Sequence, residues 1–138
     1  MLKSLTAALC LTTLFALAFS SVADARPHLR DNTYINDQLF AAAVGDQIRR
    51  NCPTISARMV LVWRKARALE RHALTEGYTE NEIEAYLESK PDIRAMEARR
   101  DSYLSEHGVR RGDADSYCTL GNAEIAAKSL IGELLRSR

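Results

Sequence analysis

The sequence has little net charge, few cysteines and, after residue 25, no long apolar run. Its 138 residues include 19 Lys and Arg against 18 Asp and Glu. A net charge near zero excludes the binding of polyanions by bulk charge, and it excludes a charged disordered tail. No stretch after residue 25 is apolar enough to span a bilayer. We therefore expect no nucleic-acid partner and no membrane span beyond the N-terminal segment.

The motifs of common enzymes and cofactor-binding proteins are also missing. The sequence has no nucleophile elbow, P-loop, GxGxxG motif, haem-attachment motif or calcium loop. It also lacks the CxxC and HxxxH pairs that are typical of metal sites. The histidines His28, His72 and His107 lie far apart in the sequence, and none neighbours a cysteine. The sequence thus predicts no catalytic residue, no cofactor and no bound metal.

The first 25 residues have the order of a cleaved secretory signal peptide. Lys3 is followed by an uncharged, mostly apolar run from Leu5 to Phe19 and then by the A-x-A site 23–25. This run is shorter than the roughly 20 residues that a transmembrane helix needs. We expect cleavage after Ala25, a mature N-terminus at Arg26 and a location in the periplasm. An uncleaved anchor and cleavage after Ala23 are the alternatives.

Two cysteines, Cys52 and Cys118, are left once Cys10 is removed with the signal peptide. Paired thiols become disulfides in the oxidising compartments that exported proteins reach. A bridge between them would close a loop of 66 residues, which contributes about 4 kcal/mol of stability in the chain-entropy model. A reactive thiol would need a neighbouring base, and the local sequence offers none. The sequence therefore predicts one structural disulfide.

Apolar residues recur three and four positions apart, which is typical of helices. We expect a flexible leader at 26–35 and then a single helical domain at 36–138. The first helix should begin at Asp37, with Asn36 as N-cap, and end near residue 51 before Pro53. The second should run from 55 to Gly77 as a central rod, with Trp63 as its core anchor.

Further helices are expected in the second half of the chain. A capping box at 79–82 opens a short helix, and Pro91 lies in the first turn of another that ends at Gly108. Asp113 should cap a turn or short helix that breaks at Gly121-Asn122, before a last helix at 123–135. No segment shows the alternation of a strand. The predicted fold class is all-α, a small bundle of four or five helices stapled by one disulfide.

Charged residues form two regular patterns. The glutamates Glu80, Glu84 and Glu88 form an acidic ridge along one helix face, which could bind a cation or a basic partner. A solvated face is the preferred interpretation, with the basic stripe Arg64, Arg67 and Arg71 as a candidate neighbour, because rows of surface charge contribute little stability.

Arginine supplies 15 of the 19 basic residues, and three doublets stand out at 49–50, 99–100 and 110–111. Such doublets could contact phosphate or anionic lipid. Each has an acidic residue close by in the sequence, so we expect weak anion binding at most. The RGD triplet at 111–113 is interpreted as loop chemistry, with glycine for the turn and aspartate for the cap.

The segment GDQIRRNCPTISAR at 45–58 resembles the first signature of a family of small secreted proteins from Rhodobacter-type alphaproteobacteria. A second block, RGDADSYC at 111–118, and the segments EIA at 124–126 and IGELLR at 131–136 are similar as well. The resemblance covers most of residues 34–136, and both cysteines match the family's pair. The family carries only a domain-of-unknown-function label. The resemblance therefore implies export to a periplasm but no particular activity.

We expect a non-enzymatic periplasmic domain that binds another protein or an envelope component, because an exported, disulfide-linked helical fold is combined here with an absence of catalytic motifs. One alternative is a small chaperone that responds to acid or stress, suggested by size, location and the single bridge. Another is an enzyme or lipid-binding protein whose site forms only in the folded chain. A large apolar pocket with convergent polar groups would favour the last alternative.

Overall fold

The computed structural model describes residues 26–138, so the predicted signal peptide lies outside the described residues. The elements in chain order are η1 (Leu29–Asp31), α1 (Thr33–Asn51), β1 (Ile55–Ala57), α2 (Met59–Thr75), α3 (Glu80–Glu88), α4 (Lys90–Glu106), α5 (Ala114–Ala127), α6 (Leu130–Glu133) and β2 (Leu135–Ser137). The predicted all-α class is confirmed, with a short two-stranded sheet added to it.

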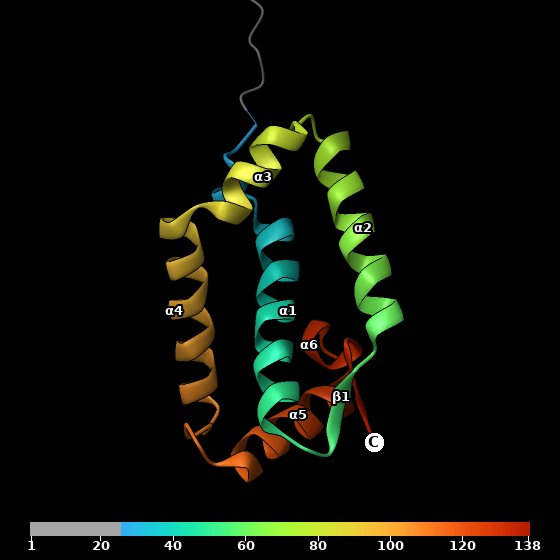
Figure 1. Ribbon diagram of the computed structural model, residues 1–138, viewed down its shortest axis with the longest axis vertical. Coiled ribbons are helices and arrows are strands. Elements are labelled where there is room, and N and C mark those ends of the chain that lie inside the picture. Colours follow the sequence, from blue (N-terminus) through green and yellow to red (C-terminus); the bar gives the residue numbers. More distant parts are fainter. Residues whose placement is uncertain (1–25) are drawn as a thin grey trace, which may run out of the picture.

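Helix α1 runs through the middle of the molecule, with α2 and α4 on opposite sides of it (Figure 1). Helix α3 crosses one end between α2 and α4, whereas α5 and α6 lie at the other end. The larger buried cluster is at the α5 end and includes Val44, Ile48, Ile55, Leu104, Leu120 and Ile131. A smaller cluster at the α3 end consists of Leu29, Ile35, Ala73 and Tyr78. The larger cluster also includes Ala41 and Val44 in the middle of α1, so the two clusters together bury one side of this helix.

Residues 55–57 form a strand, where a helix starting at Ile55 was predicted. Strand β1 pairs antiparallel with β2, in the register Ile55 with Ser137 and Ala57 with Leu135. Ile55 is completely buried. Three-residue strands are too short to show an alternating pattern. The strand that pairs with β1 lies far from it in the sequence, near the C-terminus. The prediction was wrong because the signal for this strand is not local.

Helix α5 continues through Gly121, where a break was predicted, and ends near Lys128, which has a φ of 52°. A Cβ atom on Gly121 would lie 2.5 Å from Cδ1 of Ile55 and 2.6 Å from Cγ2 of Ile48. The glycine thus permits close packing of α5 on α1 and β1. The predicted last helix at 123–135 is divided among the end of α5, the short α6 and β2.

The N-terminal segment is more ordered than the flexible leader predicted at 26–35. Residues 29–31 form η1, and Leu29 is buried. Asn32 is the N-cap of α1 and accepts a hydrogen bond from the backbone N–H of Ile35 (3.1 Å). Asn36, the predicted cap, lies inside the helix and donates to the carbonyl oxygen of Leu29 (2.6 Å). Leu29 packs with Ile35 on α1, Ala73 on α2 and Tyr78 between α2 and α3, so this segment is part of the packed domain.

The other predicted helix ends agree with the structure. Thr79 and Glu82 form the capping box of α3, and Ser89 caps α4 with Pro91 in its first turn. Asp113 caps α5 by accepting a hydrogen bond from the backbone N–H of Ser116. Gly77, just past α2, has a φ of 90°, a conformation that favours glycine.

The predicted disulfide between Cys52 and Cys118 is present, with the two Cα atoms 5.0 Å apart. Cys52 is the C-cap of α1, and Cys118 lies in the first half of α5. The bridge therefore fastens α5 to the end of α1 inside the larger buried cluster.

Candidate functional site: an apolar groove along the central helix

An apolar groove of about 450 Å³ lies between α1, α2 and α3. Its apolar lining includes Leu39, Trp63, Leu69, Ile83, Tyr86 and Leu87, and its charged lining is Arg67 and Glu70. Volumes of roughly 300–1,000 Å³ with a mainly apolar lining are typical of binding sites. Its size and lining make this groove the best candidate for a binding site.

A second hollow, of about 250 Å³, lies on the α4 side of α1 and shares Leu39, Tyr86 and Leu87 with the groove. Ala43, Ile93 and Met96 add to its apolar lining. Leu87 is 52% exposed and Ile93 41% exposed. The shared residues join both hollows into one apolar face, which crosses α1 at the partly buried Leu39 and Ala43. We call this surface the apolar face.

Trp63 lines the groove instead of anchoring the core, because it is 63% exposed. Val62 packs against the larger cluster, Leu69 packs against the smaller one, and Ala73 is buried in the smaller one. These residues define the inward side of α2, and Trp63 follows Val62 by about 100° around the helix. Trp63 thus lies at the edge of the buried side of α2, next to the groove.

Acidic side chains border the apolar face on α3 and α4. The ridge residues Glu80, Glu84 and Glu88 are exposed, and within residues 26–138 none of them forms an ion pair. Glu84 and Leu87, three residues apart, lie on the same side of α3. Glu97 lines the second hollow and, in this part of the chain, also has no ion-pair partner. The border of the apolar face is therefore negative on α3, whereas on α4 Glu97 is accompanied by the exposed Lys90 and Arg94, which also form no ion pair among these residues.

The acidic ridge does not pair with the stripe Arg64, Arg67 and Arg71. Arg67 lies 4.0 Å from Glu70 on the same helix, and its guanidinium carbon lies 5.1 Å from the centre of the Trp63 ring. Arg64 and Arg71 form no ion pair within the described residues. The stripe and the ridge are thus separate charged surfaces.

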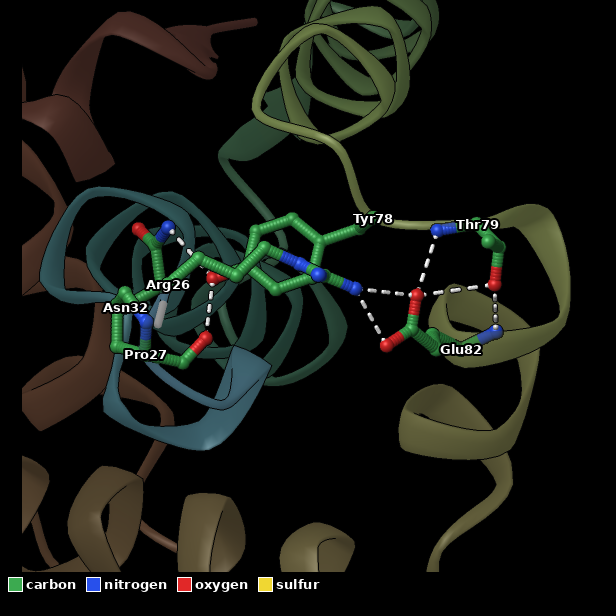
Figure 2. Close-up of polar contacts among 6 residues, drawn as sticks. All are labelled: Arg26, Pro27, Asn32, Tyr78, Thr79 and Glu82. Atoms are coloured by element: carbon green, nitrogen blue, oxygen red, sulfur yellow. Dashed lines mark hydrogen bonds and ion pairs between the residues drawn. The ribbon is translucent and has the colours of Figure 1, made fainter. Parts of the chain in front are cut away.

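A polar arrangement fastens the start of the described chain to α3 (Figure 2). The Arg26 guanidinium donates to both carboxylate oxygens of Glu82 at 2.6 and 2.7 Å and lies over the Tyr78 ring. The Tyr78 hydroxyl donates to the carbonyl oxygen of Pro27 (2.7 Å). Backbone and side-chain hydrogen bonds from Thr79 lower the pKa of Glu82 most, and Arg26 lowers it further.

The hollow beside this arrangement is larger, about 590 Å³, but its charged groups are already paired. Arg26 pairs with Glu82, and Arg30 lies 3.4 Å from Asp92. A ligand would have to displace these internal contacts. We therefore interpret this hollow as the anchoring site of the N-terminal segment and regard the apolar face as the stronger candidate.

A buried carboxylate, Glu124 on α5, accepts hydrogen bonds from the hydroxyls of Tyr103 and Ser129. Burial, followed by the hydrogen bond to Glu124, raises the pKa of Tyr103 to about 12. The Ser129 hydroxyl also accepts from the backbone N–H of Gly132 (3.0 Å) as the N-cap of α6. Because the Ser129 hydroxyl donates to Glu124 and accepts from Gly132, we interpret this network as a structural link between α4, α5 and α6. The residues of this network come from three elements, so no local sequence pattern predicts it.

Most arginines of the three doublets form ion pairs with nearby carboxylates. Arg49 and Arg50 both pair with Asp46, and Arg99 lies 2.8 Å from Asp37. In the RGD triplet, Gly112 has a φ of 83° and Asp113 caps α5 while pairing with Arg110. These contacts match the interpretation of the triplet as turn and cap.

The fold does not bring the three histidines together. His28 lines the hollow near Arg26, His72 lies 3.1 Å from Glu76, and His107 stacks on Tyr103. Across residues 26–138, no group of three or more His, Cys, Asp or Glu side chains could hold a metal ion. No helix in this range is long and apolar enough to cross a membrane.

Comparison with known proteins identifies a family but no activity. Residues 27–136 match the model of DUF5333, a family of unknown function. No curated protein and no solved structure matches the chain. The match includes both cysteines, the apolar face and every described helix. The chain therefore belongs to DUF5333, a family whose function is unknown.

Proposed function

We propose that this protein is a non-enzymatic binding module that holds an apolar helical segment of another envelope protein against its apolar face. The observation that supports the proposal best is the continuous apolar surface across α1, with Trp63, Leu87 and Ile93 all strongly exposed. An amphipathic helix laid into a groove between helices is a common mode of peptide recognition.

The charges around the apolar face favour a partner with a basic flank. The ridge and Glu97 lack ion-pair partners among the described residues, whereas Arg67, on the α2 side, is close to Glu70. Complementary charges at the rim of an interface mainly determine the association rate and specificity. A helix with apolar residues on one side and lysines next to them would match this border.

Trp63 is the only tryptophan of the protein and reports directly on the groove. We expect a lysine-flanked amphipathic helical peptide to shift its fluorescence emission to shorter wavelengths in a chain beginning at Arg26, which contains every described element. Leu87→Gln should weaken binding about tenfold or more, because burying a leucine side chain contributes about 1.5–3 kcal/mol. Fluorescence titration measures both effects.

The matched control is Leu130→Gln, which changes a leucine of similar exposure on α6, outside both hollows. It should leave peptide binding unchanged, and a glutamate-flanked peptide should bind more weakly than the lysine-flanked one. Equal binding by the Leu87 and Leu130 variants would contradict the assignment of the groove. A groove that rejects both peptides would also contradict it.

A small lipid or other apolar molecule is the second candidate occupant. The volume and lining of the groove lie within the range of small-ligand sites. A fluorescent fatty-acid probe that binds the wild type, loses affinity in the Leu87 variant and is not displaced by the peptides would favour this candidate. Client protection near pH 2–3 would instead favour the acid-responsive chaperone.

We also propose that the protein is exported to the periplasm of a Rhodobacter-type alphaproteobacterium and cleaved after Ala25. The signal-peptide pattern and the disulfide support export. The contacts of Arg26 with Glu82 and Tyr78 support a mature chain that begins there. Intact-mass measurement of protein from the periplasmic fraction should give the mass of residues 26–138. A mass that includes residues 1–25 would contradict cleavage.

A further inference from the structure

Helix α2 has an outer face that is not part of the apolar face, apart from its edge at Trp63 and Arg67. At about 100° per residue, six exposed residues lie within roughly 100° of the helix circumference. They are Val60, Trp63, Arg64, Arg67, Arg71 and Leu74. Helix α2 lies at one side of the molecule, with α1 on its inner side (Figure 1). We call these six residues the outer face of α2.

Apolar and basic side chains alternate on this face. Val60 is 76% exposed and Trp63 63% exposed, although both are side chains that normally gain from leaving water. Met59, next to Val60, is 62% exposed. Between Met59 and Thr75 the chain has four Lys and Arg residues against a single acidic one, Glu70. Helices that lie in a membrane surface combine arginine and lysine with tryptophan and aliphatic residues in this way.

A basic hollow of about 310 Å³ lies at the beginning of α2. Arg58, Arg64 and Arg136 line it together with Met59 and Val60, and its lining has no acidic residue. Arg58 donates a hydrogen bond to the backbone carbonyl oxygen of Glu133 (3.4 Å), and the Glu133 carboxylate pairs with Lys65. Arg64 and Arg136 form no ion pair in the part of the chain that the structure describes. Guanidinium groups recognise phosphate oxygens through paired hydrogen bonds.

We propose that α2 docks on the surface of an anionic phospholipid bilayer. Val60 and Trp63 enter the interface between headgroups and acyl chains, and the arginines of the hollow and the outer face contact lipid phosphates. Tryptophan favours this interface because its ring is apolar and its N–H is polar. A nucleic acid would use the arginines but would leave Val60 and Met59 exposed. The proposal shares Trp63 and Arg67 with the groove but none of the groove residues on α1 and α3.

Vesicle binding tests this proposal with a chain beginning at Arg26. We expect co-sedimentation with vesicles of phosphatidylcholine and phosphatidylglycerol, a shift of Trp63 emission to shorter wavelengths and release by salt. Arg64→Gln and Arg136→Gln should each lower the partition coefficient about fivefold, since a basic residue near an anionic surface contributes about 1 kcal/mol. Val60→Gln should weaken binding too, whereas Leu87→Gln should retain it.

The matched control is Arg94→Gln, which changes an exposed arginine of α4 that forms no ion pair among residues 26–138. Helix α4 lies on the opposite side of α1 from α2, so this change should leave vesicle binding unaffected. Equal binding to vesicles of phosphatidylcholine alone would overturn the proposal. So would an equal loss in the Arg94 variant, or a preference for duplex DNA over anionic vesicles.

Discussion

Replacing both Cys52 and Cys118 by alanine is expected to lower the free energy of unfolding by about 4 kcal/mol, because the bridge closes a loop of 66 residues. Removing the bridge frees this loop in the unfolded chain and so raises its conformational entropy. A loss of this size is a large part of the roughly 5–15 kcal/mol that stabilises a typical domain. Urea unfolding of the oxidised wild type and the double variant measures the difference.

A reducing agent provides the control for this experiment. It should bring the wild type close to the double variant and leave the double variant unchanged. Cys52 is only 1% exposed, so the folded wild type should react slowly with thiol reagents even after reduction. Equal unfolding midpoints for oxidised and reduced wild type would show that the bridge contributes nothing. Two titratable thiols in protein isolated without reductant would contradict the bridge itself.

Gly132→Ala should be similarly damaging, for a steric reason. A Cβ atom at this position would lie 1.9 Å from the carbonyl oxygen of Glu124 and 2.7 Å from the backbone nitrogen of Ile125. These are backbone atoms of α5, so relief of the clash would require α6 to move away from α5. We expect a loss of about 3 kcal/mol in the free energy of unfolding, at the upper end of the usual cost of overpacking.

Gly121→Ala is the informative comparison. Its added Cβ would meet the side chains of Ile48 and Ile55, which can shift more easily than backbone. The alanine also has the better helix propensity, by about 1 kcal/mol. The loss should therefore be smaller than that for Gly132→Ala, and thermal unfolding would rank the two. A Gly132 variant as stable as the wild type would show that α6 is free to move.

The apolar face lies over the smaller of the two buried clusters, whose residues Leu29, Ile35 and Ala73 also line the groove. The larger cluster depends on α5, α6 and the sheet. Leu39, in the middle of α1, belongs to an apolar helix pattern that the sequence shows clearly. That pattern identifies an apolar side chain and leaves open whether a neighbour covers it. The local sequence pattern is the same for an apolar residue that lines a groove and for one that is buried in a core.

The caps of α3, α4 and α5 and the disulfide followed from the sequence alone. Thr79, Ser89 and Asp113 cap helices through hydrogen bonds to residues only three positions away, so their effect is local. The bridge followed from the sequence because only two cysteines lie after residue 25. Export was also inferred from local order, and it stays a prediction.

The tertiary structure alone decided the pairing of Ile55 with Ser137, the course of α5 through Gly121 and the exposure of Trp63. Each depends on contacts between segments far apart in the chain. Periodicity and propensity describe what a segment favours by itself. Which of its sides meets another segment, and which side stays open for a partner, is determined by how the whole chain packs.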